Sequence, residues 1–416
     1  LFIDHDRFKA VNDTCGHETG DAVLAAAARR LEATVRTGDT VGRLGGDEFV
    51  VIAEDLGGDT RAEALAERIV AAFTLPLTAG EEEVVVGASV GMVAAGPKEA
   101  TPERLLREAD TAMYRAKAAG RGRAELYDDR MREEVAERLQ LARELQGALS
   151  RDELRLVYQP VFSLTDGVVA ACEALLRWHH PERGVVAPAA FVPLAEQNGL
   201  ILPIGEWVLE QACRQGAKWR RAGRDLSVSV NVSPAQLAQP DFADHVDAIL
   251  RRAGLPAQCL CLELVEGTVA RQPEGIGETL RDLRSRGVRI ALDDFGKGAT
   301  SLAHFRGLPL DVVKLDRAFV SGLREGEVSR AIVAALVSLA EGLGLTVVAE
   351  GVEREDQAAD LRELGCGLVQ GFWFGRPAAP DRLALDGYNA GVRPGLGDPF
   401  VIREFMRQIG IPARIQ

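Results

Sequence analysis

The sequence predicts two folded domains of different class, an α+β domain with a mixed sheet followed by an α/β domain built as a (β/α)8 TIM-type barrel. The first observation is the length of 416 residues, which fits two or three domains. The second is the composition, 47% hydrophobic and 27% charged, which is typical of globular proteins and excludes disordered or fibrous chains. The third is the order of elements, which alternates around a tight hairpin in the first part and repeats strand then helix in the second.

The first part predicts a sheet covered by helices. In order, we expect a strand at 1–4, a helix at 21–35, a hairpin at 40–53, a helix at 60–73, a strand at 83–93 and a helix at 102–119. We assign this domain to 1–125. Because the chain starts at Leu1 rather than Met, as if partway into a strand, we expect the domain to be incomplete at its N-terminus.

A charged amphipathic stretch separates the two parts. Leucines recur on one side of 128–147 among many Glu and Arg residues, which predicts a connecting helix within 126–150. The barrel is expected over 151–384, and the tail 385–416 carries no chemistry that the sequence reveals. The predicted barrel strands are 154–159, 168–176, 226–231, 259–264, 288–293, 311–315, 345–350 and 367–371.

Charge and composition exclude several classes of function. The net charge of −13 disfavours binding to a nucleic-acid polymer. The longest uncharged stretch, 84–96, is shorter than the roughly 20 residues that span a bilayer, so we expect no membrane contact from this chain. The six cysteines are scattered, and we expect Cys259 and Cys261 to share one face of a strand as core residues. A cytoplasmic location fits, although a longer natural protein could be tethered to a membrane.

Polar residues close six of the predicted barrel strands. Each alone could be an ordinary loop or helix-cap residue. Six at the carboxyl ends of strands indicate one shared site, because barrel enzymes place their chemistry there. These residues are Asn231, Glu263, Asp293, Lys314, Glu350 and Gln370.

The carboxylates in this set predict a divalent metal site. Oxygen ligands favour Mg²⁺ or Mn²⁺ over zinc, and two ions sharing Asp293 would allow hydrolysis of a phosphodiester. Glu350 is then the candidate general base and Lys314 a charge-stabilising group. An exposed turn is the plain alternative for the pair Asp293 and Asp294. The candidate ligands are Glu173, Asn231, Glu263, Asp293 and Asp294.

The same part of the chain resembles the EAL family of cyclic di-GMP phosphodiesterases over about 154–377. The resemblance is carried by Glu173-Ala174-Leu175, Arg177-Trp178, Asn231-Val232-Ser233, Asp293-Asp294-Phe295-Gly296, Lys314-Leu315-Asp316, Glu350-Gly351-Val352-Glu353 and Gln370-Gly371-Phe372. It implies two metal ions at the five ligands above and linear pGpG as product. It also implies ligand contacts from Gln159, Arg177 and Gln370, with support from Glu266 and Glu353.

One loop departs from the family pattern. Where the family has a Gly-x-Gly-Tyr-Ser-Ser type of sequence, this chain has Gly296-Lys297-Gly298-Ala299-Thr300-Ser301. The family associates this loop with dimer contacts and metal positioning, so the level and control of activity are open.

The first part carries a second carboxylate group. Gly45-Gly46-Asp47-Glu48 predicts a hairpin tip at which backbone can approach a phosphorylated ligand. Asp4 and Asp6 on the opening strand add carboxylates for a Mg²⁺ that bridges nucleotide phosphates. A hairpin turn without function is the alternative.

These residues resemble the GGDEF family of diguanylate cyclases, with Asp4-His5-Asp6-Arg7-Phe8-Lys9, Asn12-Asp13 and Gly20-Asp21 in support. The resemblance implies Mg²⁺ and GTP bound with Asp4, Asp47 and the His5 carbonyl, catalysis assisted by Glu48, and a homodimer. It further implies that guanine is read by Asn12 and Asp21 and that phosphates are contacted by Lys9, Lys117 and Arg121. Arg36 and Asp39 stand where the family has an inhibitory site, with a surface ion pair as the alternative.

Three functions follow as hypotheses. The leading one is turnover of cyclic di-GMP, made from GTP by the first domain and hydrolysed by the second. The alternative is a receptor that binds cyclic di-GMP or GTP without turnover. A third, an unrelated metal-dependent barrel hydrolase, leaves Arg177, Gln370 and the first domain unexplained. Neither the dominant activity nor the sensory input is set by the sequence.

Overall fold

The computed structural model describes residues 1–6, 8–54, 59–79, 82–94, 101–266, 273–295, 307–324 and 326–385. The chain divides into two compact units, Leu1–Leu141 and Ala142–Gln416. The domain boundaries at 125, 150 and 384 expected from the sequence stay predictions. Within the described ranges, no helix is both long and apolar enough to cross a bilayer.

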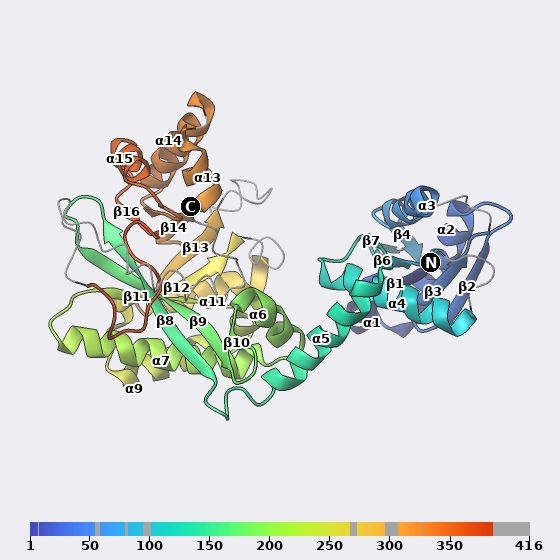
Figure 1. Cartoon of the computed structure of the whole chain (residues 1–416), viewed down its shortest axis with the longest axis horizontal. Coiled ribbons are helices and arrows are strands. Elements are labelled where there is room, and N and C mark those ends of the chain that lie inside the picture. The colour runs from blue at the N-terminus through green and yellow to red at the C-terminus, as the bar shows by residue number, and fades with distance from the viewer. Residues whose placement is uncertain are drawn as a thin grey trace, which may run out of the picture. The chain divides into compact units, whose positions relative to one another are not determined.

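The first unit is built on a five-stranded mixed sheet in the order β2-β3-β1-β6-β7 (Figure 1). All its pairings are antiparallel except that of β6 with β7. The strands are β1 (Phe2–Asp6), β2 (Thr40–Gly45), β3 (Glu48–Ile52), β6 (Gly87–Met92) and β7 (Ala124–Leu126), with a separate hairpin of β4 (Leu77–Ala79) and β5 (Glu82–Val84). The helices are α1 (Phe8–Cys15), α2 (His17–Thr34), α3 (Asp59–Ala72), α4 (Pro102–Ala118) and the connecting α5 (Asp129–Leu145).

Helices cover both faces of this sheet. Both faces carry apolar side chains, because successive residues of a strand point in opposite directions. Ile3 on β1 is fully buried in the core that includes α2 and α3. Its neighbour Phe2 packs on the other face against Ala109 and Met113 of α4. The predicted α+β class is confirmed.

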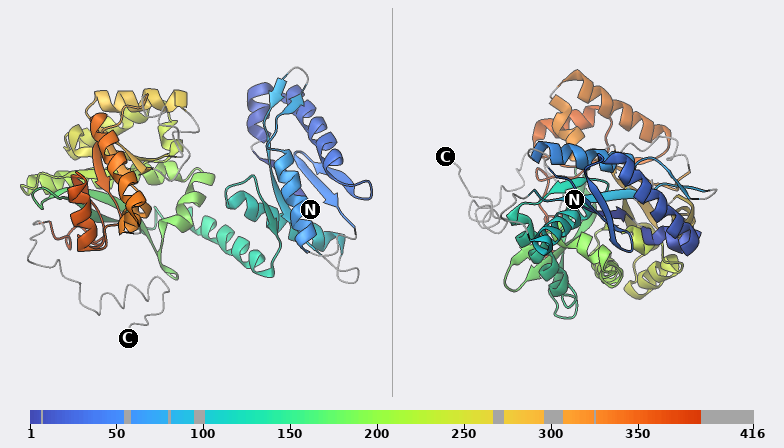
Figure 2. Two further views of the ribbon diagram at one scale, coloured as in Figure 1. Left: turned by 90° about the horizontal axis from the view of Figure 1, so that it is seen from above. Right: turned by 90° about the vertical axis from the view of Figure 1, so that its right-hand side faces the viewer.

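The second unit is an eight-stranded barrel, as predicted. Each strand pairs with the next, and β8 pairs with both β9 and β16 to close the ring. Helices lie outside the strands (Figure 1, Figure 2). The strands are β8 (Leu154–Ser163), β9 (Val169–His180), β11 (Ser227–Asn231), β12 (Leu260–Val265), β13 (Arg289–Phe295), β14 (Val312–Leu315), β15 (Thr346–Ala349) and β16 (Leu368–Val369), with β10 (Gly184–Val186) added at the edge of β9.

The helices of this unit lie between strands from β9 onward, whereas β8 and β9 are joined without a helix. The helices are α6 (Pro188–Gln197), α7 (Ile201–Arg221), α8 (Pro234–Leu237), α9 (Phe242–Ala253), α11 (Pro273–Ser285), α13 (Arg317–Ser321), α14 (Glu327–Gly342) and α15 (Glu355–Glu363), with short 3₁₀ turns η1 (Ala257–Cys259) and η2 (Gly322–Arg324).

One strand departs from an all-parallel barrel. β8 runs antiparallel to β9 and to β16, whereas the pairings from β9 through β11 to β16 are parallel. A tight connection explains this, since Gly167 adopts a positive φ of 72° and Ser163 N–H donates to Val168 C=O at 2.9 Å. A connection this short joins antiparallel strands, whereas parallel strands require a long crossover.

Several local expectations were incomplete. The helix α1, the β4–β5 hairpin and β7 were not anticipated, and the strand expected at 83–93 is two strands, β5 and β6. Cys261 lies on β12 as expected, but Cys259 lies in η1, so the two thiols do not share a strand. Both are buried, and all six cysteines are free.

Candidate active site

The strand ends bring the predicted polar residues of the barrel together around the Lys314 ammonium. Lys314 lies on β14 and is only 2% exposed. Its Nζ is 2.6 Å from Glu350 Oε1 and 2.7 Å from Glu263 Oε2. It is 3.3 Å from Glu173 Oε2 and 3.6 Å from Asp293 Oδ1. Four carboxylates from four strands or strand ends therefore face one cation.

A chain of amide groups holds Glu173 on the other side. Gln159 lies directly opposite Glu173 in the β8–β9 pairing. The side-chain nitrogen of Gln370 donates to Glu173 Oε2 at 2.7 Å and to Gln159 Oε1 at 3.2 Å. Asn231, at the end of β11, donates to Glu173 Oε1 at 2.8 Å. The predicted ligand residues Gln159 and Gln370 and the predicted metal ligands Glu173 and Asn231 thus form one hydrogen-bonded group.

A β-bulge lies at the two adjacent aspartates. The pairing of β13 with β14 shifts register between Leu292 and Phe295, so Asp293 and Asp294 lie in the irregular segment. Asp294 has a positive φ of 57°, and its N–H donates to Asp293 Oδ1 at 2.8 Å. The extra residue breaks the alternation of a regular strand. Asp293 still pairs in register with Val265 of β12 and lies two residues after the buried Ala291, so strand alternation places it on the same face; the irregular residue is Asp294.

Burial sets the ionisation of the cluster. Burial raises the pKa of Glu350 to about 7, although Lys314 opposes this shift. Burial, together with the charge of Glu173, raises the pKa of Glu263 well above its usual value, and burial also raises that of Asp293. Burial disfavours the charge of Glu173, yet Lys314 and the Gln370 and Asn231 hydrogen bonds lower its pKa overall.

The donor set fits a divalent cation. Apart from the Lys314 ammonium, every side chain of the cluster can offer a carboxylate or amide oxygen to a metal ion, which suits Mg²⁺ or Mn²⁺. Four carboxylates share one ammonium, and the buried side-chain oxygen of Gln370 has no hydrogen-bond partner. As the described residues stand, however, no three acidic, His or Cys side chains are arranged to hold a metal ion. The carboxylates gather as predicted, but around Lys314.

A cavity of about 260 Å³ opens beside this cluster. Six predicted residues line it, namely Gln159, Glu173, Asp293, Glu350, Glu353 and Gln370. Of the other predicted residues, Arg177 is half-buried further along β9 and Glu266 is buried after β12. Burial lowers the pKa of Arg177, and Glu173 acts against this shift. The altered loop Gly296–Ser301 lies outside the described residues.

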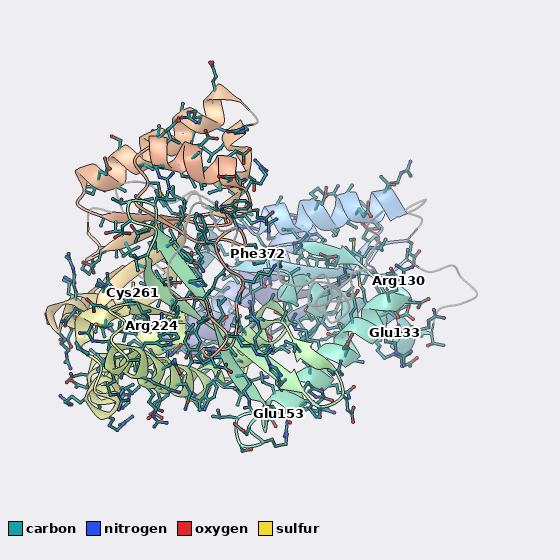
Figure 3. The ribbon with its side chains drawn as sticks, turned by 60° about the vertical axis from the view of Figure 1, so that its left-hand side comes forward. Arg130, Glu133, Glu153, Arg224, Cys261 and Phe372 are labelled. Atoms are coloured by element: carbon teal, nitrogen blue, oxygen red, sulfur yellow. The ribbon has the colours of Figure 1, made fainter. Side chains whose placement is uncertain are left out.

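Five further residues line the cavity for which the sequence predicted no role. Asp316, Arg317, Gly351, Gly371 and Phe372 line it. Phe372 is 45% exposed (Figure 3). The Arg376 guanidinium lies over its ring, with Cζ 4.4 Å from the ring centroid. These lining residues come just after Leu315, Glu350 and Gln370 in the chain. That position could have identified them, because strand-end residues and the residues that follow them lie at the same mouth of the barrel.

The first unit brings its predicted carboxylates to the centre of its sheet. Asp4 lies opposite Glu48 in the β1–β3 pairing, and Asp47 lies in the turn just before β3. Lys117 Nζ is 2.6 Å from Asp4 Oδ2. Burial raises the pKa of Asp4, Lys117 counteracts this, and the neighbouring charge of Asp47 adds to it.

The neighbouring residues take different places. The His5 ring is buried against Phe49 and Phe73, so its side chain serves the core. Asp6 accepts from Ser89 Oγ at 2.7 Å and from Gly122 N–H at 2.9 Å, which gives it a structural use.

The predicted guanine-reading residues lie near a second hollow. A cavity of about 420 Å³ is lined by Asp21, Arg43 and Phe49 among others. Asn12 packs against Gly20, where an added Cβ would lie 1.9 Å from Asn12 Oδ1. Lys9 is exposed on α1, and Arg121 lies in the turn after α4 with a φ of 64°.

Arg36 and Asp39 form an ion pair with each other. Arg36 Nε is 2.9 Å from Asp39 Oδ1, and Arg36 Nη2 also donates to the Glu54 carbonyl. The Arg36 side chain is 52% exposed and the Asp39 side chain only 2%, and the pair does not decide between a surface ion pair and an inhibitory site. The inhibitory role stays a prediction.

Comparison with known proteins identifies the two units. The EAL domain family matches residues 142–377, and the family described as diguanylate cyclase, GGDEF domain, matches residues 1–123.

The chain belongs to the EAL family and carries a GGDEF domain before the barrel.

Curated relatives share both parts. The chain is 42% identical to the bifunctional diguanylate cyclase/cyclic di-GMP phosphodiesterase MucR of Pseudomonas aeruginosa, over 92% of this chain and 56% of MucR. It is 40% identical to the cyclic di-GMP phosphodiesterase NbdA of the same organism, over 91% of this chain and 48% of NbdA. The chain thus spans about half the length of the curated relatives it matches.

Solved structures resemble the EAL barrel. The PaMucR phosphodiesterase in complex with c-di-GMP is 43% identical with a TM-score of 0.56, covering 58% of this chain and 99% of that one. The FimX EAL domain of Pseudomonas aeruginosa bound to c-di-GMP is 25% identical with a TM-score of 0.53, covering 57% of this chain and 96% of that one.

Proposed function

We propose that the EAL barrel hydrolyses cyclic di-GMP to linear pGpG with Mg²⁺ or Mn²⁺, and that the GGDEF domain condenses two GTP molecules to cyclic di-GMP. The observation that carries the first part is the convergence of Glu173, Glu263, Asp293 and Glu350 on Lys314 beside an open cavity. The c-di-GMP complexes of the MucR phosphodiesterase and the FimX EAL domain support the choice of ligand.

Different residues of the barrel have different roles in the proposed hydrolysis. Glu173, Asn231, Glu263, Asp293 and Asp294 would hold two metal ions. Bound ions supply neutralisation of the phosphate charge and activation of water.

Proton transfer falls to Glu350. Its carboxylate, with a pKa of about 7, accepts the proton of the attacking water. The new P–O bond forms as the P–O3′ bond breaks, the departing O3′ takes up a proton, and the ring opens to a 5′-phosphate. Lys314 holds Glu350 at 2.6 Å, and Gln159, Arg177 and Gln370 orient the dinucleotide.

The GGDEF domain supports a cyclase function through its central carboxylates. Asp4, Asp47 and the His5 carbonyl would hold Mg²⁺ with GTP, and Glu48 lies in register with Asp4. Asn12 and Asp21 would read guanine, and Lys9, Lys117 and Arg121 would contact phosphates. Because each domain loads one GTP, the reaction requires two copies of the chain, so we propose a homodimer.

Six free cysteines fit the reducing cytoplasm as the place of these reactions.

One experiment tests the phosphodiesterase. The purified chain is incubated with cyclic di-GMP and Mg²⁺ or Mn²⁺, and products are separated by chromatography. We expect pGpG from the wild type and none when EDTA replaces the metal. Tight binding without product would contradict hydrolysis and favour the receptor function.

A further inference from the structure

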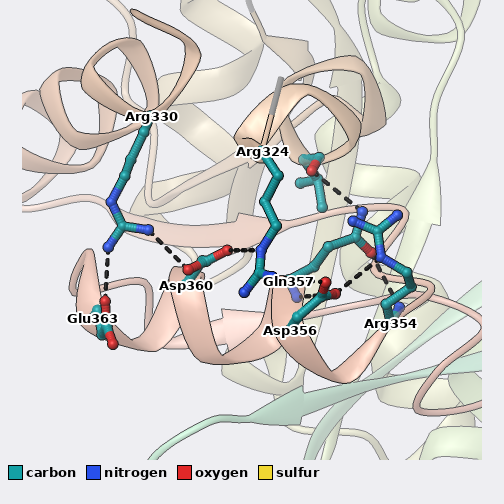
Figure 4. A network of polar contacts seen from close by, with 8 residues as sticks. Arg324, Arg330, Arg354, Asp356, Gln357, Asp360 and Glu363 are labelled. Atoms are coloured by element: carbon teal, nitrogen blue, oxygen red, sulfur yellow. Dashed lines mark hydrogen bonds and ion pairs between the residues drawn. The ribbon is translucent and has the colours of Figure 1, made fainter. Parts of the chain in front are cut away.

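Gln357 is a buried polar side chain that takes no part in the chemistry above. It lies in the first turn of α15 and is 2% exposed. Its side-chain oxygen accepts from the backbone N–H groups of Glu353 at 2.9 Å and Arg354 at 3.1 Å. Its side-chain nitrogen donates to the Val320 carbonyl on α13 at 3.3 Å (Figure 4). One side chain therefore connects the loop before α15 to α13.

These two segments follow Glu350 and Lys314. The loop begins at Glu350 directly after β15. The helix α13 begins at Arg317, three residues after Lys314 and directly after the N-cap Asp316. The contact between Lys314 Nζ and Glu350 Oε1 is 2.6 Å. The way the loop lies against α13 therefore bears on the position of the candidate general base.

The loop is closely packed on both sides. Gly351 has a φ of 69°, and a Cβ at this position would lie 2.3 Å from Cβ of Arg317 on α13. On the opposite side Val352 N–H donates to the Gln370 carbonyl at 3.1 Å, and Trp373 N–H donates to the Val352 carbonyl at 3.0 Å. Within this packing Gln357 satisfies two loop N–H groups, which would be costly to leave unpaired.

We propose that Gln357 is a positioning residue for the phosphodiester hydrolysis, which fixes the Glu350 carboxylate by tying the loop behind it to α13. The inference rests on the proposed function of the barrel. Gln357 does not line the cavity, so it acts through the loop rather than on the substrate. Because a displacement of about 1 Å in a reacting group can cost about 100-fold in rate, a loosened loop lowers kcat more than it changes binding.

Two substitutions separate the halves of this connection. Gln357→Met keeps the side-chain length and removes every side-chain hydrogen bond. Gln357→Glu keeps the acceptor for the loop and loses the donor to Val320. We expect kcat for cyclic di-GMP hydrolysis to fall about 10- to 100-fold in the Met variant and less in the Glu variant, with KM within about twofold of wild type. Amide hydrogen exchange at Glu353 and Arg354 should accelerate in the Met variant and stay near wild type in the Glu variant.

Asp360→Asn is the matched control on the same helix. Asp360 accepts from Arg324 Nε at 2.9 Å and from Arg330 Nη1 at 2.8 Å, on the side of α15 that faces η2 and α14 (Figure 4). The substitution weakens the attachment of α15 and leaves Gln357 untouched. We expect a lower melting temperature with kcat within about twofold of wild type.

The outcomes distinguish failure of the positioning role from failure of the proposed hydrolysis. An unchanged kcat in Gln357→Met, or an equal loss in Asp360→Asn, overturns the positioning role while a hydrolysing wild type keeps the proposed function. If the Met variant does not fold, the Glu variant decides, because wild-type kcat without the Val320 contact overturns the inference. A wild type that does not hydrolyse cyclic di-GMP at all overturns the proposed function, and this inference with it.

Discussion

Lys314 stands within 3.6 Å of four carboxylates and supplies the cation that holds them together. A buried ammonium surrounded in this way is stable only with its partners, because burial alone opposes its charge and the carboxylates raise its pKa well above the usual value. Removing either side of the arrangement leaves uncompensated buried charge.

Replacement of Lys314 by Met should therefore destabilise the barrel strongly. We expect the free energy of unfolding to fall by about 3–5 kcal/mol in EDTA, because the buried carboxylates lose their cation. Mg²⁺ or Mn²⁺ should restore part of this loss. Urea unfolding of the variant with and without metal measures both effects, and a variant as stable as wild type in EDTA would contradict the assigned arrangement.

Glu350→Gln should separate binding from hydrolysis. The amide keeps the shape of the side chain but accepts no proton, so kcat should fall by about 100-fold or more. Cyclic di-GMP affinity, measured by calorimetry, should stay within about threefold. Glu355→Gln on the exposed start of α15 is the control. Normal turnover in Glu350→Gln would show that Glu350 is not the general base.

Among the helices and strands, Gly91 on β6 shows how tightly α4 lies on the sheet. A Cβ at Gly91 would lie 1.9 Å from the Ala109 carbonyl oxygen and 2.2 Å from the Met113 nitrogen. These are backbone atoms of α4, so the helix itself would have to move.

Gly91→Ala should destabilise the GGDEF domain by about 1–3 kcal/mol, since an overfilled contact displaces α4 from β6. Gly42→Ala on β2, where an added Cβ meets nothing within 4 Å, is the control. Thermal unfolding followed by calorimetry measures the difference, and hydrolysis of cyclic di-GMP should be unaffected by either change. Equal melting curves for the two variants would show that α4 moves away from residue 91 with no loss of stability.

Sequence periodicity predicted the barrel strands well because most of them are apolar runs, six of which close on a polar residue. It missed α1, which is short and carries Asn12 and the β-branched Val11, and the β4–β5 hairpin, whose strands have three residues each. In the site, the strand-end rule found which side chains converge. It had no means to find the bulge at Asp294 or the reach of Gln357 to Val320, because both depend on how neighbouring elements pack.

For the whole molecule, the two proposed activities oppose each other, so they must be tested separately. With GTP as the only substrate, Glu350→Gln should accumulate cyclic di-GMP, whereas Glu48→Gln should consume no GTP yet still hydrolyse added cyclic di-GMP. Chromatography of the nucleotides over time distinguishes the two. Loss of hydrolysis in Glu48→Gln would contradict the assignment of separate reactions to the two domains.

The antiparallel strand β8 has a consequence for how the barrel forms during synthesis. β8 is the first barrel strand to leave the ribosome, and one of its two neighbours, β16, is the last. The ring is therefore closed by a contact between residues about as distant in the chain as the barrel allows, such as Phe162 with Val369. Pairings of such long range form slowly because loop closure must precede them. Until Val369 emerges, the edges of β8 and β15 remain exposed, and Gln159 and Gln370 cannot yet meet over Glu173.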